Sequence, residues 1–366
     1  MLLTKKGEIT DMKKLLLKIR PSRISFILAW FITLVVLIAP HVFAEVAGQA
    51  LLVEGAKKEG KVVIYATQPS DDMRMISDGF EKKYPFLKAE SVRVSGGGVF
   101  ISRVTQEASM KKYQVDVVVT PQLNSHLLRE KGLLAPYKPS EPVPYRHPFG
   151  DPEGYAHPIY LMSFVIGYNT KLVPKEAIPT TYEAYKDFLD ARWKGKIGMS
   201  DNIDWFPFFL AKMGEERGLD FLRRLMVQQK VQLRKDDSLN VILLASGEVP
   251  IVINTYSQNI ARMQPQGAPI DWISINPALT KALGASIMLN APHPNAARLY
   301  LDYVTSKEGQ SIIGRRMYLI PARQDVRSIF PRVEEGILEA QDISWIVNPQ
   351  TFNRYNKLYT DTILSH

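Results

Sequence analysis

Three consecutive glycines stand out among the residues that could do chemistry, because they open a stretch that reads as a helix. Ser95 precedes them and can cap this helix through its side-chain oxygen, while Gly96, Gly97 and Gly98 leave the first helical N–H groups uncovered by side chains. A helix start attracts negative charge, since its free backbone donors and the positive end of its macrodipole point the same way. The stretch therefore indicates an anion site, although such a loop is often only a tight connection.

The elements that must position this loop follow a strand, helix, strand, helix, strand pattern. We expect strands at residues 62–66, 89–94 and 115–120, and helices at residues 51–59, 71–84 and 123–131, with the glycine-opened helix in the stretch from Ser95 to Ala108. The first of these strands, at residues 62–66, is continuously apolar, which is typical of a buried parallel strand. In doubly wound sheets the loops after the carboxyl ends of the strands form the ligand crevice, so the glycine loop is expected to face one.

The same α/β pattern restarts after a long apolar run at residues 159–168. In this second part we expect strands at residues 196–199, 249–254, 270–275 and 285–289, and helices at residues 181–189, 205–213, 218–229, 238–246, 294–305 and 307–317. The restart predicts an α/β fold of two lobes, each a mostly parallel sheet flanked by helices, joined by crossing strands. Lobe 1 is expected to comprise residues 45–160 plus 285–322, and lobe 2 residues 161–284 plus 323–366.

Composition excludes several classes of function. The formal net charge is +9, but residues 1–44 hold seven Lys or Arg and two acidic residues, so the rest carries a basic excess of only four, which is no nucleic-acid footprint. Cysteine is absent, which excludes disulfides, thiolate metal sites and cysteine nucleophiles. A GxSxG elbow, HExxH and a Walker lysine motif are also absent.

The N-terminal 44 residues have the order of a secretory signal. A basic run ends at Arg23, an apolar run follows at residues 24–39, and Pro40 precedes a small-residue site that ends at Ala44. The alternative is an uncleaved membrane anchor, but the apolar run is short for a full span. We expect cleavage after Ala44 and a periplasmic protein, whether translation starts at Met1 or at Met12.

Several motifs together resemble the type II periplasmic solute-binding proteins of ABC importers, in their Fe(III)-binding-like branch. The main one is GASIMLNAPHPNAARLYLDYVTSKEGQSII, residues 284–313, in which a strand leads through an Ala-Pro-His-Pro turn to a helix and then to a Ser-Lys-Glu-Gly-Gln helix start. Others in the same order are EGAKKEGKVVIYA, VDVVVTPQ, LLREKGLLAPY, FVIGYNTKLV and ARWKGKIGMSDN. The resemblance implies a two-lobed binding protein that acts without a cofactor as a monomer and delivers a small-molecule solute to an inner-membrane ABC permease.

The sequence departs from the members of this family that bind ferric iron. Those members use two adjacent tyrosines, and phenolate oxygens are hard donors suited to a hard ion. Here Tyr256 lies between Thr255 and Ser257, and the first loop, ATQPSDDM, lacks histidine. We therefore expect no metal site and a small anionic organic solute, with a ferric iron or iron-chelate carrier as the alternative.

The expected ligand-binding residues follow from the resemblance together with the logic of the sheet. They are Thr67, Gln68, Ser95, Gly96, Gly97, Thr120, Tyr160, Ser200, Asp201, Asn254, Thr255 and Tyr256. Most offer neutral hydroxyl, amide or backbone donors, which suit a carboxylate or a phosphate. Tyr256 is the preferred single residue, because a tyrosine just past a strand end can enter the crevice.

Each of these residues also has a structural alternative. Thr67 or Gln68 can cap the next helix, Ser200 and Asp201 with Asn202 can cap another, and Asn254 with Thr255 can form a turn. Two rival functions remain beside the transport subunit. One is an enzyme that uses Asp201 and Asp204 as an acid and base, and the other is a ligand-sensing partner of a membrane receptor.

Overall fold

The computed structural model describes residues 48–94, 97–147, 149–235, 237–276, 278–334, 338–340 and 348–365. The expected signal segment lies outside these residues. The strands are β1 (Lys61–Ala66), β2 (Lys88–Arg93), β3 (Val117–Pro121), β4 (Leu134–Ala135), β5 (His157–Asn169), β6 (Ile197–Ser200), β7 (Gln232–Arg234), β8 (Ile251–Tyr256), β9 (Ile270–Ile273), β10 (Ala278–Met288), β11 (Ile320–Pro321) and β12 (Leu338–Ala340).

The described chain begins in a helix at residues 48–59. The further α-helices are α3 (Ser70–Lys83), α4 (Gly97–Ser109), α5 (Gln122–Glu130), α6 (Phe206–Met213), α7 (Glu215–Gln229), α8 (Asp237–Ser246), α9 (Ser257–Ala261), α10 (Pro294–Thr305), α11 (Lys307–Arg316) and α12 (Pro349–Tyr359). Short 3₁₀ turns include η2 (Glu183–Leu189), η4 (Ile203–Trp205) and η6 (Pro331–Glu334). In the part of the chain that is described, no helix has the length and apolar character needed to cross a bilayer.

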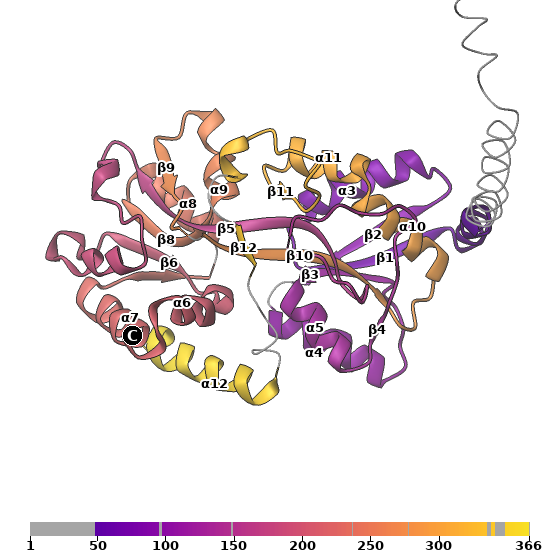
Figure 1. Cartoon of the computed structure of the whole chain (residues 1–366), viewed down its shortest axis with the longest axis horizontal. Helices are drawn as coiled ribbons and strands as arrows, with labels where there is room; N and C mark the ends of the chain where they lie inside the picture. The colour runs from indigo at the N-terminus through magenta and orange to yellow at the C-terminus, as the bar shows by residue number, and fades with distance from the viewer. Residues whose placement is uncertain are drawn as a thin grey trace, which may run out of the picture. The chain divides into compact units, whose positions relative to one another are not determined.

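The strands form two groups that share one sheet. The order across the sheet is β2, β1, β3, β10, β5, β8, β6, β7. We call β2, β1, β3, β10 and the first half of β5 the first strand group, and the second half of β5 with β8, β9, β6 and β7 the second strand group. In Figure 1, α3, α10 and α11 cover one face of the first group, and α4 and α5 cover the other.

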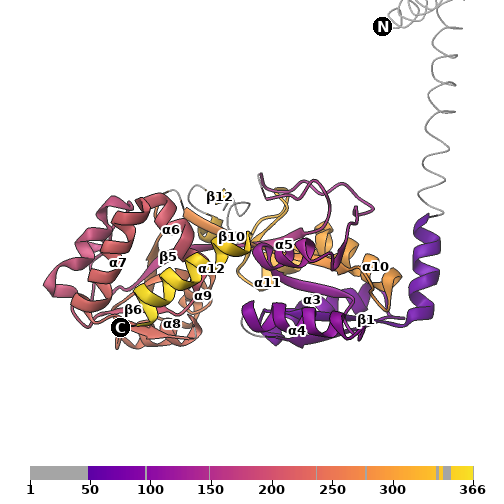
Figure 2. The ribbon, with the colours of Figure 1, turned by 90° about the horizontal axis from the view of Figure 1, so that it is seen from below.

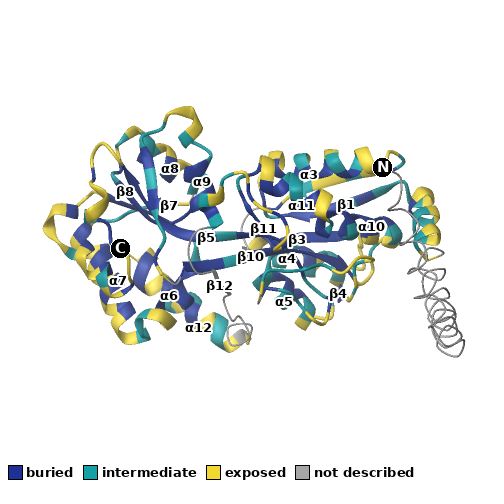
Figure 3. Cartoon of the chain, turned by 45° about the horizontal axis from the view of Figure 1, so that its top comes forward, coloured by how far each residue is buried: buried dark blue, intermediate teal, exposed yellow. Residues whose placement is uncertain are grey.

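Parallel pairing within each group follows from the apolar strands that the sequence predicts. In the first group β1 pairs with β2 and β3 in parallel, so their carboxyl ends meet at one edge. In the second group β6 pairs in parallel with β7 and β8. Figure 3 shows that the inner strands β1, β3, β6 and β8 are largely buried, whereas the edge strand β2 is mostly exposed and β7 is half-buried. The predicted α/β layering is therefore present in both groups.

Two long antiparallel strands connect the groups. Residues 157–163 of β5 pair with β10, whereas its residues from Phe164 onward pair with β8 and β9. β10 in turn lies between β5 and β3. Figure 2 shows both strands running from one group to the other. The expected strand at residues 285–289 was too short, since β10 begins at Ala278, and the sequence signal was broken by Lys281 and Gly284.

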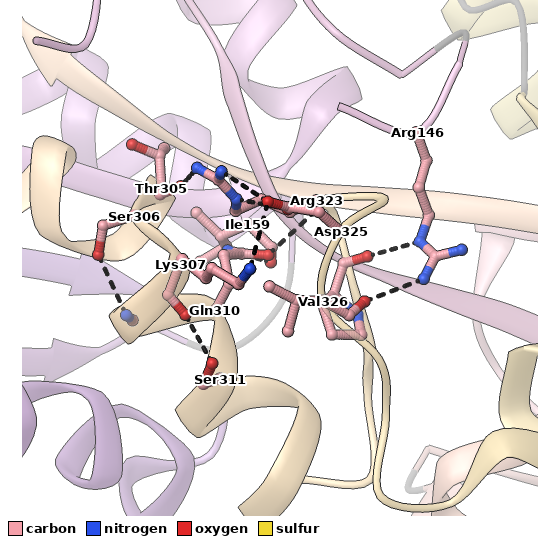
Figure 4. Close-up of polar contacts among 12 residues, drawn as sticks. Arg146, Ile159, Thr305, Ser306, Lys307, Gln310, Ser311, Arg323, Asp325 and Val326 are labelled. Atoms are coloured by element: carbon pink, nitrogen blue, oxygen red, sulfur yellow. Dashed lines mark hydrogen bonds and ion pairs between the residues drawn. The ribbon is translucent and has the colours of Figure 1, made fainter. Parts of the chain in front are cut away.

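A third connection leaves the first group at β11, which pairs with Tyr160 and Leu161 of β5. The buried side chain of Gln310 on α11 connects the backbone of β5 to the segment after β11. Its amide donates to the carbonyl oxygen of Ile159 at 2.7 Å and its oxygen accepts from the backbone N–H of Arg323 at 3.3 Å (Figure 4). Figure 4 also shows Arg146 donating to the carbonyl oxygen of Val326, at 3.2 Å.

The segment after β11 then reaches the second group. Its turn η6 carries Arg332, whose guanidinium pairs with Asp271 of β9 and lies 4.1 Å from the ring centroid of Trp272. Phe330 packs on Trp272 as well. Within the described residues, β5, β10 and the segment after β11 thus each run between the two strand groups.

Candidate functional site

The predicted residues of the first strand group gather after the carboxyl ends of β1 and β3. Gln68 is buried and donates from Nε2 to the hydroxyl of Thr67 at 2.9 Å. Neither residue caps the next helix, because Pro69 occupies the N-cap of α3. Thr120 is buried in β3 and accepts from the side-chain amide of Asn124 at 2.8 Å.

The glycine-opened helix is present as α4, which begins at Gly97. Ser95 and Gly96 lie outside the described residues. Nothing lies within 4 Å of the position that a Cβ atom on Gly98 would take, so the start of this helix is open to approach. The backbone donors there have the geometry that favours an anion.

Tyr160 lies in β5, where it pairs with Leu283 of β10 next to a shift of register. Burial raises the pKa of its hydroxyl well above the ordinary value, and the side chain of Gln68 hydrogen-bonds to it. Gln68 Oε1 itself is buried and has no hydrogen-bond partner among the described residues.

Two predicted residues of the second strand group support the scaffold. The Ser200 hydroxyl donates to the carboxylate of Asp237 at the start of α8. Asp201 accepts from the Tyr359 hydroxyl of the C-terminal helix α12 at 3.1 Å. The capping role that was the alternative for both belongs to Asn202, whose side chain accepts from the backbone N–H of Asp204 at 2.9 Å.

Asn254 and Thr255 lie within β8, at a bulge opposite β5. Asn254 adopts a left-handed φ of 54°, and the pairing with β5 shifts register between Val165 and Gly167. Bulges of this kind re-aim side chains and are common next to binding sites. Asn254 Nδ2 and Thr255 Oγ1 are buried and without hydrogen-bond partners among the described residues.

Tyr256 is the last residue of β8, and its ring is 5% exposed. The ring packs on Phe164 at a centroid distance of 4.8 Å, and the hydroxyl accepts from Asn202 Nδ2 at 2.9 Å. Burial raises the pKa of this hydroxyl above its ordinary value, although Lys281 acts in the opposite direction. A neutral phenol is a poor ligand for ferric iron, and no group of three His, Cys, Asp or Glu side chains with metal-binding geometry occurs within the described residues.

Lys281 is the residue of this site that sequence analysis missed. Its ammonium lies 4.9 Å from the ring centroid of Tyr256 and pairs with the carboxylate of Asp204. Burial alone would lower the pKa of Lys281, but the attraction of Asp204 and Tyr256 outweighs it and raises the pKa. A signal for it was present, since Lys281 is the single charged residue in the eleven residues of β10.

A hollow opens beside this ion pair, between the two strand groups. It is small, with about 30 Å³ of space for the centres of water-sized molecules. Its lining residues are Pro121, Gln122, Leu123, Phe149, Asp204, Phe208, Thr280, Lys281 and Ala282. They come from the end of β3 and the start of α5, from the segment after β6, and from β10. None of the predicted site residues lines the hollow itself, but Thr120 adjoins Pro121 and Tyr256 contacts Lys281.

Comparison with known proteins identifies the class to which this fold and site belong. The sequence profile of a family described as "Bacterial extracellular solute-binding protein" matches residues 115–348. Because this match spans more than half of the chain, the protein belongs to that family. The family consists of binding proteins, which is the class that the sequence favoured over an enzyme.

Two relatives are similar to this chain in sequence. An uncharacterized protein of Haemophilus influenzae is 27% identical over 274 residues, with 70% of this chain and 76% of the relative covered. A Salmonella typhimurium protein described as a putative 2-aminoethylphosphonate-binding periplasmic protein is 24% identical over 265 residues, with 66% of this chain and 73% of that protein covered.

Solved structures share the fold. AfuA from Actinobacillus pleuropneumoniae, determined with fructose 6-phosphate bound, superposes with a TM-score of 0.70 at 21% identity and covers 84% of this chain and 99% of its own. Iron-bound HitA from Pseudomonas aeruginosa gives a TM-score of 0.69 at 18% identity, with 83% and 99% covered. AfuA is a periplasmic binding protein, and the two-lobed α/β fold expected from the sequence is therefore confirmed.

Proposed function

We propose that this chain is the extracytoplasmic binding subunit of an ABC importer and that it captures a small anionic organic solute between its two strand groups. The observation that carries the proposal is the hollow beside Lys281, a buried cation that faces residues of both groups. An anion held there gains from the low local dielectric and from fixed neutral donors. In this proposal the chain is exported as a monomer after cleavage behind Ala44 and delivers its solute to the permease.

The mechanism is a shift between open and closed forms. A solute that contacts residues of both groups at once stabilises the closed form, and only such differential affinity can drive closure. The two lobes, residues 45–160 plus 285–322 and residues 161–284 plus 323–366, would rotate about β5 and β10. The change of pairing partner between Ser163 and Phe164 in β5 supports this division.

The predicted site residues fit this proposal as an outer ring of donors. The start of α4 at Gly97, with Ser95 and Gly96 before it, offers backbone N–H groups, and Gln68, Thr67 and Thr120 lie at the neighbouring strand ends. From the second group, Asn254 and Thr255 supply buried polar atoms that lack partners among the described residues. Tyr256 contacts Lys281 from behind the hollow, and Ser200 and Asp201 hold the scaffold through Asp237 and Tyr359, whereas Tyr160 is a buried residue of β5.

A screen of candidate solutes tests the proposal. Protein produced from the full-length chain is tested by thermal shift against organic acids, sugar phosphates, phosphonates, polyamines and metal salts. We expect stoichiometric stabilisation by at least one organic anion, together with a smaller radius of gyration in X-ray scattering. Chemical turnover of the bound compound, or stabilisation by ferric citrate alone with a phenolate-to-iron absorption band, would overturn it.

A further inference from the structure

Two opposite charges lie side by side in the wall of the hollow. Among the described residues that line it, Lys281 and Asp204 are the charged ones. The side chain of Lys281 is 11% exposed and that of Asp204 is 28% exposed, so both ends of the pair are mostly removed from water but Asp204 keeps a face toward the hollow. The rest of the lining is apolar or neutral.

This arrangement is unfavourable for a simple anion. A phosphate or carboxylate that approaches the Lys281 ammonium must come close to the carboxylate that already binds it. In a partly buried hollow, repulsion between two like charges at contact distance is strong. A simple anion therefore binds well only if Asp204 moves away, and the backbone of Asp204 is fixed by the side chain of Asn202.

A solute that carries its own ammonium group meets no such conflict. Its anionic end can lie against Lys281 while its cationic end lies against Asp204, so four charges alternate in sign. A short aliphatic spacer between the two ends would pack on the apolar part of the lining, which includes Leu123, Phe149 and Phe208. Both protein charges keep a partner when the solute is bound.

We infer that the solute is a small zwitterion, with its anionic group on the ammonium of Lys281 and its ammonium group on the carboxylate of Asp204. This inference rests on the proposed function and names the class of solute for the same site. It makes Asp204 the residue that selects for the ammonium group and Lys281 the residue that binds the anion.

The test uses pairs of probes that differ only in the ammonium group. Each pair replaces the ammonium by a methyl group: 2-aminoethylphosphonate and propylphosphonate, phosphoethanolamine and propyl phosphate, 4-aminobutyrate and pentanoate. Fructose 6-phosphate is the anion without an ammonium group. Binding is measured by calorimetry on protein from the full-length chain. We expect at least one zwitterion to bind about tenfold or more tightly than its methyl partner.

Two variants assign the selectivity to the residues. Asp204→Asn is isosteric, and we expect it to reduce the preference to about threefold or less, mainly through weaker binding of the zwitterion. Lys281→Met should weaken both members of each pair. Asp220→Asn, at an exposed carboxylate on α7 that pairs with Arg224, is the matched control and should keep the preference.

The outcomes separate the inference from the proposed function. Equal binding of both members by the unmodified protein, binding of fructose 6-phosphate alone, or an unchanged preference in Asp204→Asn would overturn the inference and leave the capture of an anion standing. Failure of every organic anion to bind would overturn the proposed function and the inference with it. Should Asp204→Asn fail to fold, the ratio measured on the unmodified protein still decides.

Discussion

At the scale of single residues, Tyr256 contributes to stability in two ways. Its ring packs on Phe164, and its hydroxyl accepts a hydrogen bond from Asn202. Replacement by Phe keeps the ring on Phe164 but leaves Asn202 Nδ2 without its acceptor, which we expect to lower the free energy of unfolding by about 1–3 kcal/mol. Replacement by Ala also removes the buried ring, with an expected loss of about 3–5 kcal/mol. Urea unfolding of the three proteins measures both. An alanine variant as stable as the phenylalanine variant would show that the ring is not packed.

The buried side chain of His157 should make the stability of the folded protein fall as the pH falls. Its Nε2 faces the carbonyl oxygen of Gly154 at 3.1 Å and must donate to it, so Nδ1 of the neutral ring accepts from the Tyr145 hydroxyl, also at 3.1 Å. Burial lowers the pKa of His157 below its ordinary value of 6.5. The unfolded chain therefore takes up a proton first as the pH falls, and stability is lost below the ordinary pKa.

We expect the melting temperature to fall between about pH 7.5 and pH 5.5, and to fall less in His157→Gln. Asp302, whose pKa burial raises, acts in the opposite direction but is common to both proteins. His126→Gln, at a half-buried position on α5, controls for the loss of one histidine. Parallel curves for the unmodified protein and His157→Gln would contradict the assignment.

The sequence predicted residues that lie near the hollow, but it did not predict the ion pair between Lys281 and Asp204. Strand ends are recognisable from apolar runs, so Tyr256 and the loop from Ser200 onward were placed close to the hollow. The pairing of Lys281 with Asp204 joins residues that are 77 positions apart, and no local pattern specifies such a contact. The available signal was a single lysine inside an apolar run. Whether that lysine belongs to the site depends on which segments lie beside β10, and the sequence does not show this.

At the scale of elements, the ends of a helix were predicted well where a proline or a capping residue marks them in the sequence. α10 has the predicted bounds because a proline opens it and apolar residues recur at helical spacing. The next helix begins where Ser306 accepts from the backbone N–H of Gly309 at 3.2 Å. The expected helix at residues 181–189 is instead the 3₁₀ turn η2 over Glu183–Leu189, where tertiary packing of Tyr185 and Phe188 overrides the helical pattern.

Gly309 is required by a close approach between α10 and α11. A Cβ atom there would lie 2.2 Å from the carbonyl oxygen of Tyr303, a backbone atom that cannot turn away. We expect Gly309→Ala to lower the free energy of unfolding by about 3 kcal/mol, measured by chemical denaturation. Gly98→Ala is the matched control near another helix start, where space is open and alanine is the better helix former, so no loss is expected. Equal effects of the two changes would argue against the close approach.

At the scale of the whole molecule, the third connection should contribute to stability. The Glu334 carboxylate accepts from Arg146 at 3.0 Å and from Arg327 at 2.8 Å, and the side chains of Arg146 and Glu334 are both mostly buried. We expect Glu334→Gln to cost about 3 kcal/mol, because the Arg146 charge remains buried without its partner. Hydrogen exchange should rise most in residues 320–334.

The control for this change is an exposed ion pair of the same chemistry. Glu308 pairs with Lys83 on the surface at 2.9 Å, and Glu308→Gln should cost about 1 kcal/mol or less. If the two glutamine variants are equally stable, the segment after β11 does not hold the groups together.

The two-group layout itself was predictable from the restart of the α/β pattern, but the order of strands was not. Nothing local shows that β10 inserts between β3 and β5. That insertion pairs Val118 of β3 with Ser286 of β10. The sheet of the first strand group can therefore be completed only after β10 has been synthesised. The early half of the polypeptide lacks its neighbouring strand until nearly three hundred residues have been synthesised, so it should stay loose and receptive to chaperones while it emerges.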